Sequence, residues 1–194
     1  DYISRALWEA RRVAPRARLM INEFGLEYDT RVDHDRRYHF LKLIERLKKA
    51  AVPLDGIGLQ SHLELSKGQL ATQAFTALIR EIADFGLFIV VTELDVKEHD
   101  CTLPPDERDR RVADATARYL DVVLAHPAVR GVISWGLSDR HSWLEVTAED
   151  RARYPGAWKD GSGPGLNRGL PFDAGMRRKP MYAAIGDALR RAGG

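Results

Sequence analysis

Cysteine is almost absent from this chain, and several other features that mark special classes of protein are also missing. Cys101 is the only cysteine among 194 residues, so neither an internal disulfide bond nor a cysteine-based metal site can form. No apolar run approaches the ~18 residues that a membrane-spanning helix needs. Lysine and arginine total 30 and aspartate and glutamate total 28, a balance that favours neither nucleic acid nor a membrane surface as a partner.

Motifs for the commonest cofactor and nucleophile chemistries are missing as well. No Gly-x-Gly-x-x-Gly or phosphate loop follows any expected strand, which argues against a nucleotide-binding fold, and we expect no cofactor. No serine or cysteine lies in a nucleophile elbow, so acyl transfer lacks support. Side chains that could bind a metal are present, but none are paired at a spacing such as His-Glu-x-x-His. The hypothesis of a metal site therefore rests on composition alone. The residues that could bind a metal are His62, Glu93, Asp95, Asp139 and His141.

What the chain does contain is an alternation of short apolar runs and amphipathic segments. We expect strands at 18–22, 54–62, 88–96 and 129–135, helices at 1–13, 35–50, 67–85, 106–126 and 180–192, and a long Gly/Pro-rich loop at 138–172. Strand starts recur every ~30–45 residues with one helix between them, a spacing typical of βαβ units in a parallel sheet. Four such units are half of an eight-stranded barrel, and a four-unit open sheet is the alternative. The chain begins at Asp1 within a helical pattern, so we expect the natural sequence to extend upstream.

The third expected strand, Phe88–Val96, ends in two carboxylates. Its unbroken apolar run predicts a strand buried on both faces. Side chains alternate along a strand, so Glu93 and Asp95 should leave the same face. Buried acids are costly unless they have a function, and the carboxyl ends of parallel strands are where active sites lie.

The other three strands also end in polar or aromatic residues. Each residue alone has a structural explanation, as a local hydrogen-bonding group, a helix cap or a core aromatic. Their occurrence at one end of all four strands favours a functional site. A carboxylate beside histidine and tryptophan fits sugar chemistry, because glycosidases use carboxyl groups and indole faces stack on sugar rings. The additional residues are Asn22, Gln60, His62, Trp135 and, further on, Trp143.

At this point the chain resembles glycoside hydrolase family 10, the endo-1,4-β-xylanases. The segments that carry the resemblance are Leu54-Asp-Gly-Ile-Gly-Leu-Gln-Ser-His62, Val91-Thr-Glu-Leu-Asp-Val96, Ile133-Ser-Trp-Gly-Leu-Ser-Asp139 and the helix start Lys179-Pro-Met-Tyr-Ala-Ala-Ile185. Asn22-Glu-Phe-Gly-Leu-Glu27 is similar to the family's fifth-strand motif, usually Asn-Asp-Tyr-Asn. The resemblance implies an α/β fold, a (β/α)8 TIM barrel, of which residues 1–194 supply only the last four βα units, strands 5–8.

The resemblance also implies an activity and a set of roles. The activity is retaining hydrolysis of internal β-1,4 bonds in xylan or xylo-oligosaccharides, in an extracellular or periplasmic location. The motif match assigns Glu93 as nucleophile and His62 and Asp95 as the pair that hold it ionised. It assigns substrate binding to Asn22, Gln60, Trp135 and Trp143. Gly25 stands where the family usually has Asn, which predicts weaker contacts at the first strand.

The family's general acid is the missing part. It is a glutamate in a Trp-Asp-Val-Val-Asn-Glu motif, which does not occur in this chain. Asn22-Glu23 matches the last two residues of that motif. However, Glu23 lies only two strands before Glu93, whereas the family's acid lies three strands before the nucleophile. We therefore interpret Glu23 as a strand-end or subsite residue. We therefore expect little activity from these residues alone, and self-association through exposed barrel edges. A carbohydrate-binding pseudoenzyme and a metal-dependent hydrolase stay open as alternatives.

Overall fold

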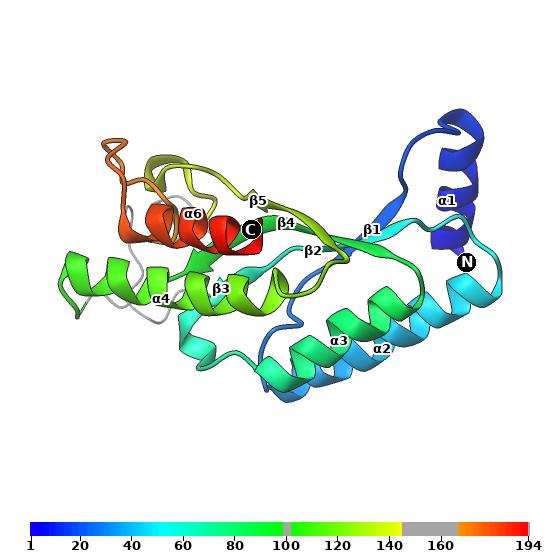
Figure 1. Ribbon diagram of the computed structural model, residues 1–194, viewed down its shortest axis with the longest axis horizontal. Helices are drawn as coiled ribbons and strands as arrows, with labels where there is room; N and C mark the ends of the chain where they lie inside the picture. Colours follow the sequence, from blue (N-terminus) through cyan, green and yellow to red (C-terminus); the bar gives the residue numbers. More distant parts are fainter. Residues whose placement is uncertain (99–101, 145–166, 194) are drawn as a thin grey trace, which may run out of the picture. The chain divides into compact units, whose positions relative to one another are not determined.

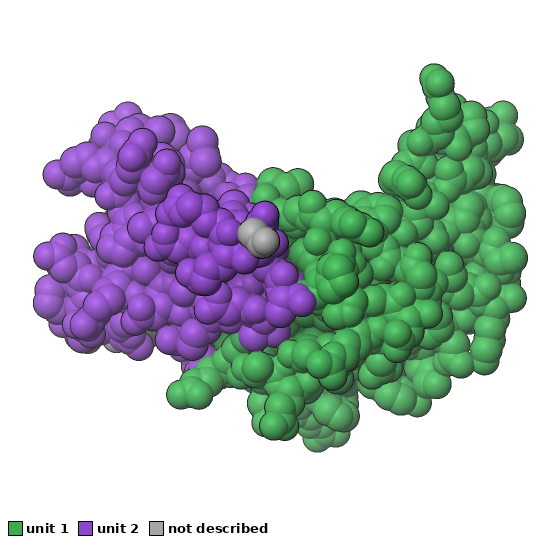
Figure 2. Space-filling model, viewed as in Figure 1, with its two compact units in different colours: residues 1–61, 69–93, 126–133 green, residues 62–68, 94–125, 134–194 purple. Residues whose placement is uncertain are grey.

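A computed structural model describes residues 1–98, 102–144 and 167–193. Cys101 and most of the expected loop at 138–172 lie outside these residues. The chain divides into two compact units (Figure 2). Unit 1 comprises residues 1–61, 69–93 and 126–133, and unit 2 comprises residues 62–68, 94–125 and 134–194.

Unit 1 contains a parallel sheet with helices. Its elements are α1 (Tyr2–Val13), β1 (Met20–Glu23), α2 (Arg31–Lys49), β2 (Gly56–Leu59), α3 (Thr72–Asp84), the first six residues of β4 (Phe88–Lys97) and most of β5 (Val129–Ser134). Strand β1 pairs in parallel with β2, and β2 pairs in parallel with β4. Strand β5 also pairs with β4. The predicted α/β class with parallel strand pairing is confirmed.

Helices α2 and α3 run side by side (Figure 1) and bury one apolar face each. In α2 the buried residues Phe40, Ile44 and Leu47 recur at the spacing of one helix face. This helix begins earlier than the expected residue 35, because the Thr30 side chain accepts a hydrogen bond from the backbone N–H of Asp33 and caps the first turn. Helix α3 begins later than expected, since residues 65–67 form a separate 3-10 turn.

The predicted strand at 54–62 is wrong in its extent. Strand β2 ends at Leu59, and a second strand, β3 (His62–Glu64), begins after Ser61. Ser61 has a φ of 65°, a left-handed conformation that interrupts a strand. In unit 2, β3 pairs in parallel with the second part of β4, and His62 lies opposite Asp95 in the register.

Unit 2 also contains helices, in addition to the pairing of β3 with β4. Helix α4 (Pro105–Val123) packs against α6 (Pro180–Ala192), as Figure 1 shows. Tyr119 and Leu120 of α4 and Met181 of α6 are buried. A 3-10 turn, η2 (Asp139–His141), precedes Trp143. The bounds of α6 agree with those expected from the sequence. No helix within the described ranges has both the length and the apolar character needed to cross a membrane.

Candidate active site

Strands β1 and β2 of unit 1 end beside the middle of β4, and Asn22, Gln60 and Glu93 lie at this level. Glu23 and Leu59 are the last residues of β1 and β2, and Leu59 is the register partner of Val91, which lies within β4 two residues before Glu93. The backbone N–H of Gln60 donates to the carbonyl of Glu23 at 2.9 Å and extends the β1–β2 pairing by one hydrogen bond. Side chains that follow these positions therefore leave the sheet at one edge.

Glu93 is half-buried and is held by Asn22. The Asn22 Nδ2 donates to Glu93 Oε1 at 2.9 Å, and Thr92 Oγ1 donates to Asn22 Oδ1 at 2.9 Å. Gly58 lies beside Asn22 on the neighbouring strand, and a Cβ there would come within 2.2 Å of Asn22 Oδ1. The glycine thus makes room for the amide that orients the carboxylate. From the sequence, Asn22 was expected only to bind substrate, and its bond to Glu93 is an additional finding.

A second group lies in unit 2 and centres on Asp95. The Asp95 side chain is 0% exposed. The ring nitrogen Nδ1 of His62 lies 2.8 Å from Asp95 Oδ1, and Trp143 Nε1 donates to Asp95 Oδ2 at 2.6 Å. Each oxygen of this buried carboxylate therefore has a ring N–H partner, as a buried charge requires.

Two tryptophans flank His62 within unit 2. The centroid of the His62 ring is 5.0 Å from that of Trp143 and 6.3 Å from that of Trp135, the latter in an edge-on arrangement. Trp135 is 46% exposed and Trp143 is 58% exposed. Large exposed indole faces can stack on the apolar faces of sugar rings. The predicted neighbours His62, Asp95, Trp135 and Trp143 are thus brought together.

A buried charge cluster anchors the segment that carries Trp143. Lys179 Nζ donates to Asp139 Oδ2 at 2.8 Å and lies 3.2 Å from Asp109 Oδ1. Arg168 binds the same Asp109 carboxylate through two nitrogens. Burial raises the pKa of Asp139, and the charge of Lys179 opposes that rise. No local sequence pattern predicts this cluster, because its members lie far apart in the chain.

The residues considered as metal ligands are engaged in other contacts or dispersed. Asp139 is ion-paired with Lys179, and Asp95 is bonded to His62 and Trp143. In the parts of the chain that the structure describes, no group of three or more His, Cys, Asp or Glu side chains could hold a metal ion.

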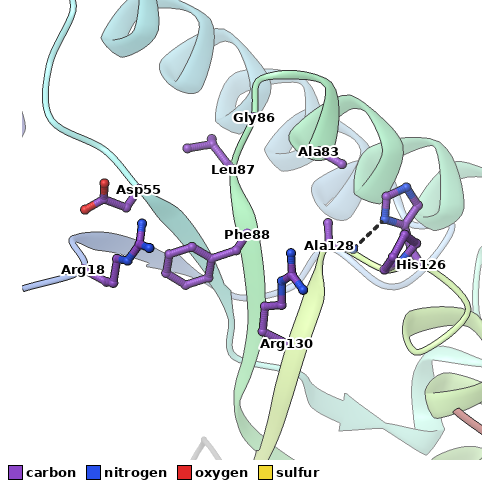
Figure 3. A pocket seen from close by; sticks show the side chains of 10 residues that line it. Arg18, Asp55, Ala83, Gly86, Leu87, Phe88, His126, Ala128 and Arg130 are labelled. Atoms are coloured by element: carbon purple, nitrogen blue, oxygen red, sulfur yellow. Dashed lines mark hydrogen bonds between the residues drawn. The ribbon is translucent and has the colours of Figure 1, made fainter. Parts of the chain in front are cut away.

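A hollow of about 710 Å³ lies at the other end of the strands in unit 1 (Figure 3). It is lined at the strand starts by Arg18, Asp55, Phe88 and Arg130, with the Phe88 ring between the two arginines. The amino ends of barrel strands contribute to stability, whereas chemistry occurs at the carboxyl ends. This hollow is therefore not a candidate active site, despite its size.

Comparison with known proteins decides the family. The sequence profile of glycosyl hydrolase family 10 matches residues 1–188. The chain belongs to this family. It is 28% identical over 190 residues to endo-1,4-beta-xylanase B of Thermotoga neapolitana, covering 97% of this chain and 48% of that protein. It is 33% identical over 188 residues to endo-1,4-beta-xylanase A of Phanerodontia chrysosporium, covering 95% of this chain and 40% of that protein.

Solved structures agree with this assignment. Native xylanase 10B from Thermotoga maritima superposes with a TM-score of 0.78 at 29% identity, over 98% of this chain and 52% of that chain. Xylanase 10B from Thermotoga petrophila, solved in complex with xylobiose, superposes with a TM-score of 0.76 at 29% identity. The family 10 chain thus spans about half the length of these relatives, and its fold matches part of theirs. The predicted family is confirmed. The half of the barrel and the roles of individual residues stay predictions.

Proposed function

We propose that residues 1–194 form the C-terminal half, strands 5–8, of the catalytic barrel of a retaining endo-1,4-β-xylanase. The order of the sequence motifs supports this half, and the partial coverage of the relatives supports a partial barrel. The observation that carries the proposed chemistry is the carboxylate of Glu93 on β4, which lies beside the carboxyl ends of β1 and β2 and is oriented by the amide of Asn22.

In this mechanism Glu93 is the nucleophile. One of its oxygens attacks the anomeric carbon of a xylose residue, the bond to the leaving sugar breaks, and a glycosyl-enzyme ester forms. Water then attacks the same carbon and releases the sugar with its original configuration. The hydrogen bond from Asn22 to Oε1 fixes the carboxylate plane, so the nucleophile is oriented before the substrate arrives.

The group in unit 2 serves substrate binding. Asp95 fixes the orientation of the His62 and Trp143 rings through its two hydrogen bonds. The exposed faces of Trp135 and Trp143 supply stacking surfaces for sugar rings. The family resemblance assigns His62 and Asp95 to keeping the nucleophile ionised, and Gln60 to the reacting sugar.

The proton donor for the leaving sugar is expected outside this sequence. Glu23 is not assigned that role, because it lies only two strands before Glu93, whereas the family's acid lies three strands before the nucleophile. Its Oε1 accepts a hydrogen bond from the backbone N–H of Phe24 at 2.9 Å. General acid–base assistance contributes about 10²–10⁴ to the rate. We therefore expect the 194-residue chain alone to hydrolyse xylan very slowly or not at all.

The test measures the anomeric configuration of the first product by proton NMR, with the full-length protein and xylan. Retention supports the proposal, and release of the inverted anomer contradicts it. The isolated chain should be inactive in the same assay and should self-associate in sedimentation, because β1 has one strand neighbour among the described residues and leaves its other edge unpaired. A monodisperse monomer that hydrolyses xylan would contradict the partial-barrel proposal.

The exposure of Trp135 and Trp143 favours a second candidate function, carbohydrate binding without cleavage. Titration of the full-length protein with soluble xylo-oligosaccharides, followed by product analysis, separates the two functions. Binding without shorter products would support the non-catalytic alternative.

A further inference from the structure

An arginine from α2 lies over the segment that follows β1 in unit 1. The guanidinium carbon of Arg36 is 4.3 Å from the centroid of the Phe24 ring. Its Nη1 donates to the carbonyl oxygens of Phe24 at 3.2 Å and of Gly25 at 3.4 Å. Phe24 is 48% exposed, and Arg36 is half-buried. A cation and an accessible aromatic ring therefore share one place in the fold.

Gly25 is what admits this guanidinium. A Cβ at residue 25 would lie 2.0 Å from Arg36 Nη1, and the backbone there has a φ of 64°. A larger residue would therefore be strained and would displace the arginine. From the sequence, the glycine in place of the family's usual Asn predicted weaker contacts at this strand end. The structure instead places a positive charge in that space.

The charge of Arg36 has no acidic partner in the described part of the chain. The nearest acidic residue along α2, Asp35, lies 3.8 Å from Arg31 Nε and 3.5 Å from His34 Nδ1. The two carbonyl oxygens and the phenyl ring compensate part of the desolvation of Arg36, but they carry no formal charge that balances the guanidinium. Its planar fork matches a carboxylate with two parallel hydrogen bonds. The unpaired charge thus points to a carboxylate ligand.

The position of this pair connects it to the proposed nucleophile. Phe24 follows Asn22 by two residues, roughly 7 Å along an extended chain, and Asn22 donates to Glu93. A sugar bound at Phe24 and Arg36 is therefore close to the sugar that would react at Glu93.

We propose that Arg36 and Phe24 form a subsite for an acidic sugar, a uronic acid substituent carried by the xylan chain. The carboxylate pairs with the guanidinium, and an apolar edge of the sugar contacts the exposed phenyl ring. This inference rests on the proposed xylanase function. The competing explanation is that Arg36 only holds the Phe24 and Gly25 carbonyls in place. In that case its loss affects acidic and neutral substrates equally.

The experiment compares kcat/KM for xylotetraose with kcat/KM for the same oligosaccharide carrying one glucuronic acid, using the full-length protein. Arg36→Gln should lower the acidic-to-neutral ratio roughly fivefold, as expected for loss of a partly exposed charge-assisted contact. Arg36→Lys, which keeps the charge but loses the fork, should retain part of the preference. Arg46→Gln is the matched control, because Arg46 is an exposed arginine of the same helix, ten residues further on.

Each outcome decides between the possibilities. In the wild-type protein the ratio of kcat/KM for the acidic to the neutral oligosaccharide should fall at about 0.5 M NaCl, because salt screens the charge pairing. This salt measurement serves as the test if Arg36→Gln does not fold. A ratio that neither salt nor Arg36→Gln changes overturns the acidic subsite and leaves the xylanase function standing. Failure of the wild-type protein to hydrolyse either oligosaccharide overturns both.

Discussion

The hydrogen bond from Trp143 to Asp95 offers a quantitative test of the group in unit 2. Trp143→Phe keeps an aromatic ring beside His62 but removes the N–H that donates to Asp95 Oδ2 at 2.6 Å. Since the Asp95 side chain is 0% exposed, water cannot replace the lost donor. Hydrogen bonds to charged groups contribute about 1.5–3 kcal/mol. Trp143 is itself largely exposed, so the lost apolar burial adds little, and we expect a total of about 2 kcal/mol.

The assay is urea denaturation of the full-length protein, followed by far-UV circular dichroism, with the free energy of unfolding compared at constant m-value. Trp8→Phe is the control, because Trp8 is 52% exposed on α1 and its replacement should change stability by less than about 0.5 kcal/mol. Equal small effects of the two substitutions would refute the reasoning. They would mean that the hydrogen bond from the indole N–H to the Asp95 carboxylate does not contribute to the free energy of unfolding.

Two further predictions concern packing and pH. Gly169→Ala should lower the free energy of unfolding by at least about 2 kcal/mol, because the added Cβ would lie 1.6 Å from a backbone oxygen of β4. Gly131→Ala is the control and should be tolerated, since a Cβ there meets nothing within 4 Å. Equal shifts of the melting temperature in the two variants would contradict this. Hydrogen bonds from Lys49 and Lys42 lower the pKa of Glu45 to about 2, so the stabilisation from this carboxylate is present above its unfolded pKa and is lost as the pH falls through about 2. If NMR at low salt shows that the Glu45 carboxyl titrates with the ordinary pKa of a glutamate, this contribution to stability is contradicted.

Much of the fold could be predicted from the sequence, because alternating apolar runs and amphipathic segments are local patterns. The bounds of α6 follow from its proline at the first turn and its apolar spacing. The break between β2 and β3 could not be predicted, since the left-handed conformation of Ser61 is set by the strand pairings on either side of it. The early start of α2 depends on the Thr30 cap, since threonine before a helix is itself a start signal in the sequence.

The candidate site was predictable where its residues are close in sequence or carried by a motif. The spacing of Glu93 and Asp95 placed both on one strand, and the motif match brought His62 to Asp95, as the structure shows. The bond from Asn22 to Glu93 and the position of Arg36 over Phe24 depend on long-range packing. Glycines gave the available signal for both, because Gly58 and Gly25 leave the space that these side chains occupy.

The most direct test of the central claim compares two glutamates in the full-length protein. Glu93 is the proposed nucleophile, and Glu23 is proposed to be a strand-end residue. The measurement is the turnover of xylan by Glu93→Gln and by Glu23→Gln, with folding of both variants checked by circular dichroism. We predict that Glu93→Gln abolishes turnover and that Glu23→Gln retains most of it. Near-normal turnover of Glu93→Gln together with loss of activity in Glu23→Gln would contradict the account.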